Sequence, residues 1–564
     1  MTSIPRWRDT VRTGLLWGAG AVFTSLVGLV AALQPRQIIT GVISGGHALL
    51  LVALVAAGIS AARRYADAPR RAAAGALAGA IVGASVAALV LLARVVNLRA
   101  MIVGATPELF ALLTLGRGSG VLPWIVLGAA GLGALGGLLT VLPRQVRSIV
   151  TTGAATLLGV GLLQEQVQLL LQSDRVARLR EIVFTFDGLT PVGAGLVVAL
   201  STVLSGVWQW QQPKTKERMA ALPPTRRRVL QIVGFAAGLG AILVLPLFVG
   251  PFFSQVLVLV GLYTLMGLGL NLEVGFAGLL DIGFVAFFAI GAYTVGLLTT
   301  TGPLAIAHVS WWTATMIAVV VSLISGVLFG LPILGIRGDY LAIATLGFGE
   351  IIRLLVLSDF LRPVLGGSQG VLSIPKPVLF GFEFRGPEQI FFLALGASAI
   401  IAFIAARLRD SRLGRAWMAM REDEDVAQAM GINLVNVKLL AYGIGAVFAG
   451  VSGAIFAVMV GSIFPHSFSV LVSINVLALI IVGGMGSLPG VAVGALFLVG
   501  LPELLREFSD YRFLVYGAAL MAMMILRPEG LWPAPAQRRE LHEEVARIPE
   551  GELVEAGAAG AEDP

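Results

Sequence analysis

The sequence predicts an all-α, polytopic integral membrane protein, and both its composition and its patterning support this fold class. Of the 564 residues, 57% are hydrophobic and only 13% are charged, which is far more apolar than a typical soluble chain. Apolar runs of about twenty residues, enough for a helix to cross roughly 30 Å of hydrocarbon, recur along the chain. We therefore expect about 16 transmembrane helices, about six in an N-terminal extension and about ten in a following core.

The first expected spans precede residue 228 and are bounded by Arg, Pro or Gly. They cover 14–33, 41–61, 72–93, 121–142, 148–171 and 188–210. The first of them resembles a signal sequence because Arg6, Arg8 and Arg12 precede it. It is longer than the hydrophobic region of an ordinary signal peptide, and an equally apolar run follows, so we expect it to be retained as a span.

The second set of expected spans follows residue 228. It covers 229–249, 253–272, 277–300, 312–335, 340–358, 389–406, 439–463, 470–485, 489–505 and 513–526. The two short runs on either side of GGMGSLPG, residues 483–490, could form a re-entrant element instead of two full spans.

The basic residues predict the orientation of the spans. With the N-terminus in the cytoplasm, most flanking Lys and Arg residues fall in cytoplasmic loops, as the positive-inside rule requires, and both termini are cytoplasmic. This topology explains the net charge of +7, which therefore does not indicate a nucleic-acid partner. Arg far outnumbers Lys, and Ala and Gly are abundant, which is typical of GC-rich bacterial coding. We expect the cytoplasmic (inner) membrane of a bacterium.

Several kinds of site have no support in the sequence. Cysteine is absent, so no disulfide, thiolate zinc site or cysteine nucleophile can form. No nucleophile and base stand in a recognisable arrangement, and there is no GxxxxGK[ST] phosphate loop, since Lys214 and Thr215 lack its glycines. We therefore expect that the chain is not an enzyme and binds no cofactor. We also expect no metal site, because the four histidines are far apart and lack ligand spacing: His47, His308, His466 and His542.

Two changes in composition predict the domain boundaries. The stretch 211–228 is charged, contains prolines and lacks apolar periodicity, which predicts a joint between residues 1–228 and 229–533. Residues 534–564 are acidic and rich in Ala, Gly and Pro, and cannot bury a core. We expect a multi-span extension of unknown role, a membrane core and a disordered cytoplasmic tail.

The largest charged island of the core, residues 407–438, has the pattern of two short amphipathic helices. Apolar residues recur there at three- and four-residue spacings, and Gly431 stands where a helix would end. These apolar residues are Trp417, Met420, Ala427 and Met430. The pattern suits docking to a soluble partner that pushes on the membrane part, but it fits a solvated, topology-fixing loop equally well.

Four stretches of the core carry a family resemblance: GLNLEVGFAGLLDIGFVAFFAIGAY at 269–293, IRGDYLAIATLGFGEIIR at 336–353, GRAWMAMREDEDVAQAMGIN at 414–433 and LALIIVGGMGSLPGVAVGAL at 477–496. Together they resemble the inner-membrane permease subunits of branched-chain amino acid ABC importers, specifically the M-type of the two permeases. The resemblance covers about 229–533, whereas residues 1–228 show no recognised family pattern.

The resemblance implies that the 407–438 loop holds the coupling helix that docks on an ATP-binding subunit. The residues on that motif are Arg421, Glu422, Asp423, Glu424, Asp425 and Gly431. It also implies import of branched-chain or related amino acids. The implied partners are a second permease subunit, two ABC ATPase subunits that use ATP and Mg, and a periplasmic or lipid-anchored solute-binding protein, within membrane lipid.

A few polar residues inside the spans are candidates for a translocation pathway, because intramembrane charges are costly. They are Asn271, Asp281, Thr345, Glu350 and Arg353. Helix capping at the membrane interface is the simpler explanation for Asn271, Glu273 and Asp281, which flank a turn. Glu350 and Arg353 lie three residues apart on one helix face, so a structural ion pair is the simpler explanation for them.

A glycine-rich segment is expected in an outside loop. It comprises Gly366, Gly367, Ser368, Gln369 and Gly370. Its composition predicts a flexible turn, and the family resemblance implies a surface that receives the solute-binding protein.

Three other functions stay open at this point. Related permeases for urea or short amides look alike. A self-contained secondary transporter would need no motor and would use Glu350 and Arg353 as its coupling site. A membrane enzyme or sensor would use residues 1–228 as a regulatory module.

Overall fold

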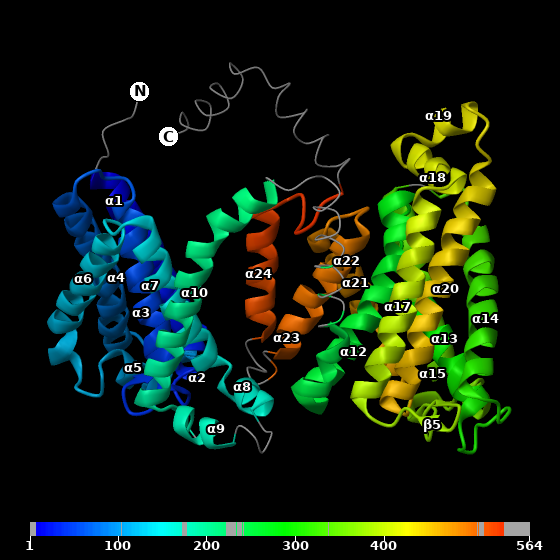
Figure 1. Ribbon diagram of the computed structural model, residues 1–564, viewed down its shortest axis with the longest axis horizontal. Helices are drawn as coiled ribbons and strands as arrows, with labels where there is room; N and C mark the ends of the chain where they lie inside the picture. Colours follow the sequence, from blue (N-terminus) through cyan, green and yellow to red (C-terminus); the bar gives the residue numbers. More distant parts are fainter. Residues whose placement is uncertain are drawn as a thin grey trace. The chain divides into compact units, whose positions relative to one another are not determined.

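The computed structural model describes residues 7–534 except 103, 172–176, 186, 221–232, 234–237, 239, 241, 337, 505 and 507–511. The chain divides into two compact units, Met1–Gly238 and Leu239–Pro564, and the described residues of both are mainly helical (Figure 1). The predicted tail lies outside the described residues from 535 onward.

The first unit consists of helices that largely follow the expected apolar runs. They are α1 (Trp7–Leu26), α2 (Leu29–Ala32), α3 (Gly45–Ala62), α4 (Ala68–Val95), α5 (Pro107–Leu113), α6 (Leu122–Leu139), α7 (Arg144–Leu162), α8 (Gln164–Leu170), α9 (Ala177–Val183) and α10 (Pro191–Ala220). Short strands β1 (Gln37–Ile39), β2 (Ile43–Ser44) and β3 (Gly188–Leu189) form a sheet of order β2-β1-β3, in which β1 is antiparallel to β2 and parallel to β3.

Glycines let the helices of the first unit approach closely. Gly133 of α6 lies against Gly75 and Gly79 of α4, and a Cβ atom at Gly79 would stand 3.0 Å from Gly133 Cα. Gly58 of α3 meets the same Gly133 backbone. Small residues at such contacts let backbones pack by van der Waals forces, which is how helices associate in lipid.

The predicted joint at 211–228 begins as helix. Helix α10 continues to Ala220, beyond the expected end of its span at 210, and residues 221–228 lie outside the described part. Long polar side chains such as Gln and Lys are good helix formers, so loss of apolar periodicity did not end this helix. The division between the units falls at Gly238, ten residues after the expected position at 228.

The second unit holds the remaining helices. They are α12 (Pro246–Leu270), α13 (Val285–Thr299), α14 (Trp311–Ile333), α15 (Asp339–Leu357), α16 (Arg362–Leu365), α17 (Pro387–Arg409), α18 (Arg412–Glu422), α19 (Glu424–Ala429), α20 (Leu434–Val460), α21 (Val470–Gly483), α22 (Leu488–Ala495), α23 (Leu501–Leu504) and α24 (Arg512–Leu526). Strands β4 (Val378–Leu379) and β5 (Phe382–Glu383) form a small antiparallel hairpin.

Helix α20 is central to the second unit, packing against α12, α13, α14 and α17. Helix α12 ends in a π-helical turn, η4 (Asn271–Phe276), and an irregular segment, 277–284, leads to α13. Figure 1 places α18 and α19 at one end of this unit and β5 at the opposite end. A unit with this build can present one surface on each side of a membrane.

The all-α, polytopic fold is confirmed, but the count of sixteen spans is not. Among the described residues, nine helices are long and apolar enough to cross a membrane, or up to 11 if each of two bent pairs is one span. The expected span at 229–249 lies in part outside the described residues, and its last four residues, 246–249, belong to α12. The expected span at 277–300 is wrong in its first part, because the helix starts only at Val285, after a loop with Gly278 at φ 73°.

The short pair around GGMGSLPG is sharply bent. The chain direction bends by 120° between the helices Val470–Gly483 and Leu488–Leu504, which fits a broken span or a re-entrant loop. Gly484 and Gly486 have φ values of 113° and 75°, which L side chains rarely adopt, so glycine is needed at this bend.

Candidate functional site

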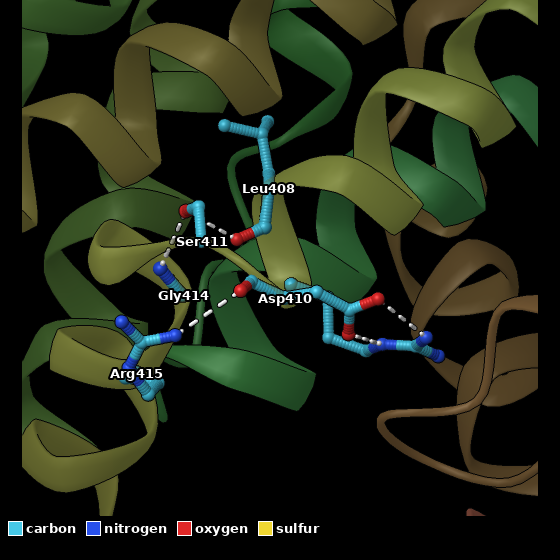
Figure 2. Close-up of polar contacts among 6 residues, drawn as sticks. Leu408, Asp410, Ser411, Gly414 and Arg415 are labelled. Atoms are coloured by element: carbon cyan, nitrogen blue, oxygen red, sulfur yellow. Dashed lines mark hydrogen bonds and ion pairs between the residues drawn. The ribbon is translucent and has the colours of Figure 1, made fainter.

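Helix α18 starts from a tight turn at the end of α17 (Figure 2). The Ser411 hydroxyl accepts a hydrogen bond from Gly414 N at 3.2 Å and donates one to Leu408 O at 2.6 Å. Arg415 Nη1 donates to Asp410 O at 3.1 Å. This N-cap with its flanking contacts fixes the direction in which the loop leaves α17.

An ion pair stands at the same exit. Arg409 Nε donates to Asp410 Oδ1 at 2.9 Å, and this hydrogen bond holds the pKa of the Asp410 carboxyl below its ordinary value. Both groups are exposed, so the pair contributes little stability.

The inner sides of α18 and α19 pack on the core of their own chain. Trp417, Met420 and Ala427 are buried, and Trp417 is 0% exposed with its Nε1 donating to Val437 O at 2.9 Å. The helices are as the sequence predicted, but most of the apolar pattern serves this internal packing and is not free for a partner. Met430, the fourth member of the pattern, is 79% exposed.

Three of the six predicted coupling residues are tied into the chain. Arg421 Nη1 donates to Gly275 O at 2.7 Å, which joins α18 to η4. Lys438 of α20 lies 2.8 Å from Glu424, with the lysine side chain almost fully buried. Gly431 ends the α19 turn at φ 89°, in the left-handed region that favours glycine.

The other three residues are exposed. Asp423 is the N-cap of α19, because its Oδ1 accepts hydrogen bonds from Asp425 N and Val426 N, both at 2.9 Å. Glu422 and Asp425 are exposed beside it. Four exposed side chains of this loop, which we call the coupling surface, are Met418, Glu422, Val426 and Met430.

The polar residues near the end of α12 form a buried cluster. Asn271 and Asp281 are buried, and Asn271 Oδ1 accepts a hydrogen bond from Gly486 N at 2.8 Å. Asp281 Oδ1 accepts one from Gly283 N at 2.7 Å, and Thr345 Oγ1 of α15 accepts one from Ile282 N at 3.0 Å. Asp281 and Thr345 are therefore brought together, whereas Asn271 is joined to the bend at Gly486.

The predicted explanation of helix capping is wrong for this cluster. Asn271, Glu273 and Asp281 are all buried inside the unit, and none of them caps a helix with its side chain. The helix does not stop at Asn271 but continues as the π turn η4, in which Asn271 and Glu273 are buried, and Asp281 lies in the loop that follows.

Sequence reasoning did not include Glu273 and Tyr442 among the candidate residues. Glu273 is buried and lies near Asp281, and the Tyr442 ring of α20 lines a small cavity together with Asp281 and Thr345. A lone Glu within an apolar run was a usable signal, because buried charge in a membrane protein indicates function. Tyr442 carried no comparable signal, since only the fold places α20 against η4.

Glu350 and Arg353 form the predicted local ion pair. Arg353 Nε stands 3.0 Å from both carboxylate oxygens of Glu350, and both side chains are partly exposed. They lie on α15 beyond Thr345, and Arg353 lines a separate small cavity. The pair is neutralised locally and is not part of the buried cluster.

The glycine-rich segment is ordered. Gly366 and Gly370 have φ values of 83° and 66°, and Val371 exchanges two backbone hydrogen bonds with Ile463, at 2.9 and 2.8 Å. The glycines are buried, whereas Ser368 and Gln369 are exposed. Backbone pairing of the adjacent Val371 with the segment after α20 thus holds one end of the glycine-rich turn.

Gly445→Ala is expected to lower the stability of the second unit by about 1–3 kcal/mol. A Cβ atom at this α20 position would collide with Glu273 Oε1, which packs directly on the helix backbone. The measurement is the thermal unfolding midpoint of the purified chain. Gly396→Ala in α17 is the matched control, since its Cβ would meet nothing within 4 Å. Equal midpoints for the two variants would contradict the packing of Glu273 on α20.

The second unit is similar in sequence to known proteins. Residues 252–526 match the family described as branched-chain amino acid transport system / permease component. The high-affinity branched-chain amino acid transport system permease protein LivM of Salmonella typhimurium is 41% identical over 295 residues, 48% of this chain and 68% of the relative. LivM of Escherichia coli is 40% identical over 309 residues, 51% of this chain and 71% of the relative.

More distant relatives include the second type of permease. The high-affinity branched-chain amino acid transport system permease protein LivH of Escherichia coli is 24% identical over 291 residues, 48% of this chain and 92% of the relative. No solved structure is significantly similar to this chain. The extent of the match to LivM settles the affiliation. The chain belongs to the family of branched-chain amino acid transport system permeases.

Proposed function

We propose that this chain is a permease subunit of an ATP-driven importer and that its cargo is branched-chain or related amino acids. The observation that carries the proposal is the coupling surface: α18 and α19 bury Trp417, Met420 and Ala427 and still expose Val426 and Met430 at one end of the unit. Exposed apolar side chains on a rigid helix pair suit docking to a soluble partner. The names of the LivM and LivH relatives support the cargo.

The importer would be assembled from several proteins. The partners are a second permease subunit, two ABC ATPase subunits that bind ATP and Mg, and a solute-binding protein outside the cytoplasmic membrane. Both termini of the chain and the coupling surface are on the cytoplasmic side. Residues 1–228 are an accessory helical module of this subunit.

Reconstitution tests the proposed function. The chain is assembled with its partner subunits in liposomes, and uptake of labelled leucine is measured with and without ATP. Competition with isoleucine, valine, urea and a short amide assigns the cargo. ATP-dependent uptake that the amino acids compete for is the expected result. Uptake by the chain alone, driven by an ion gradient, would instead establish a secondary transporter, and competition by urea alone would overturn the cargo.

Replacing Ser368 and Gln369 with arginine is expected to lower uptake about tenfold when the binding protein is scarce, which corresponds to about 1.4 kcal/mol. Both side chains are exposed on an ordered segment at the end of α16, so added bulk and charge would hinder a docked protein without disturbing the fold. The measurement is uptake as a function of binding-protein concentration. Thr301→Arg, at another exposed loop position, is the control. Unchanged concentration dependence would contradict the docking role.

A further inference from the structure

Two carboxyl groups lie in the core of the second unit without a basic partner. Glu273 of η4 is 0% exposed and Asp281 of the following loop is 2% exposed. They are the buried acidic side chains among the described residues. A backbone hydrogen bond from Leu279 N to Glu273 O, at 2.9 Å, brings the loop that carries Asp281 beside Glu273. No basic side chain in the described part of the chain forms an ion pair with either. Two uncompensated negative charges in a low-dielectric interior are strongly unfavourable.

The hydrogen bonds around the two groups differ. Asp281 Oδ1 accepts a hydrogen bond from Gly283 N at 2.7 Å, which stabilises an ionised carboxylate. Neither oxygen of Glu273 has a donor among the described residues, although both atoms are buried. Two carboxylates cannot bond each other, because both only accept, whereas a protonated carboxyl donates. A proton on Glu273, given to Asp281, therefore satisfies both groups.

Among the described residues, the groups that surround Glu273 and Asp281 place no positive charge on either carboxyl group. From α20, Tyr442 is 2% exposed and has a hydroxyl without a hydrogen-bond partner in the described part of the chain. Tyr442, Asp281 and Thr345 of α15 line a cavity of about 10 Å³, at the lower limit for one water molecule. From α18, the Arg421 guanidinium is directed to Gly275 O, 2.7 Å away. Tyr442 thus borders the same small cavity as Asp281 from a separate helix.

We propose that Glu273, Asp281 and Tyr442 form a buried proton-binding site, in which Glu273 carries one proton and donates it to Asp281. The site shares its backbone with the contact of the coupling loop, since Gly275 lies two residues from Glu273 and is held by Arg421. A change in the position of α18 would act on the segment that holds the proton. This inference does not depend on the cargo or on the identity of the partners.

Infrared spectroscopy of the purified full-length chain in lipid nanodiscs tests the site at neutral pH. We expect a carbonyl-stretching band of a protonated carboxylic acid that shifts on transfer to D₂O and is lost in Glu273→Gln. Asp359→Asn, which changes an exposed carboxylate between α15 and α16, should keep the band. In Asp281→Asn the band should remain at a shifted frequency, because its acceptor has changed.

Two results would overturn the proposal. One is the absence of a protonated-acid band from the wild-type chain, or a band that Glu273→Gln leaves unchanged. The other is a rise in the unfolding temperature with NaCl or KCl, but not with a bulky organic cation, that Glu273→Gln abolishes. That second result would assign the site to an alkali-metal ion in place of the proton. If Glu273→Gln fails to fold, two other observations test the proposal. They are the shift of the wild-type band between H₂O and D₂O and the shifted frequency of the band in Asp281→Asn.

Discussion

Replacing Val426 and Met430 together with aspartate is expected to abolish ATP-driven uptake while the chain still folds and inserts. Both side chains are more than half exposed in this chain, so the substitutions leave its core intact. In the proposed complex they pack against an ATPase subunit, where each buried apolar side chain contributes about 1.5–3 kcal/mol. Losing both would weaken docking by at least about a hundredfold.

The measurements are copurification of the ATPase subunits and ATP-dependent leucine uptake in the reconstituted complex. Phe360→Asp is the matched control, because Phe360 is also an exposed apolar residue but lies between α15 and α16, away from the coupling surface. It should retain the ATPase subunits. Full copurification and uptake with the Val426 and Met430 variant would remove the docking role from α19.

Substituting the acidic run 422–425 is a less informative test than the sequence suggests. Asp423 caps α19, and Glu424 pairs with the buried Lys438, so reversing these charges would disturb the loop itself. Breaking such a pair leaves a lysine charge buried, which is costly. Of the acidic side chains here, Glu422 belongs to the coupling surface, and Glu422→Lys is the cleaner change.

The sequence predicted the fold class and most helices because long apolar runs and flanking basic residues are local properties. The sequence-based prediction failed where the start or end of a helix depends on more than the local pattern of residues. Helix α10 runs into a polar stretch, and α13 starts late because the segment 277–284 is stabilised by contacts with α15 and α18. Those contacts join residues that are far apart in sequence, which periodicity does not show.

The candidate site was predicted in part for the same reason. The two short helices of residues 407–438 and the Glu350–Arg353 pair rest on spacings within one helix or loop, and the structure has them. Which side of α18 is buried depends on α20, and the burial of Glu273 depends on its packing against Gly445 of α20, so neither could be inferred from one segment. The family resemblance indicated Arg421 as a candidate residue but did not predict its hydrogen bond to Gly275 O.

Trp417→Ala is expected to detach α18 from the core and to cost about 3–5 kcal/mol of local stability, because it removes a fully buried aromatic ring. The same change leaves Val437 O without the indole donor. A detached α18 cannot transmit force from an ATPase to η4, so uptake should fall to background even where the ATPase still binds.

Trp417→Phe separates the two contributions, since it keeps most of the ring volume and loses only the hydrogen bond. Hydrogen exchange of residues 412–431 should rise strongly in Trp417→Ala and modestly in Trp417→Phe. Trp124→Ala, at a mostly exposed position on α6, should leave this exchange unchanged. Slow exchange in Trp417→Ala combined with lost uptake would contradict the anchoring role and place Trp417 in the contact with the partner. Fast exchange combined with normal uptake would show instead that coupling does not need a rigid α18.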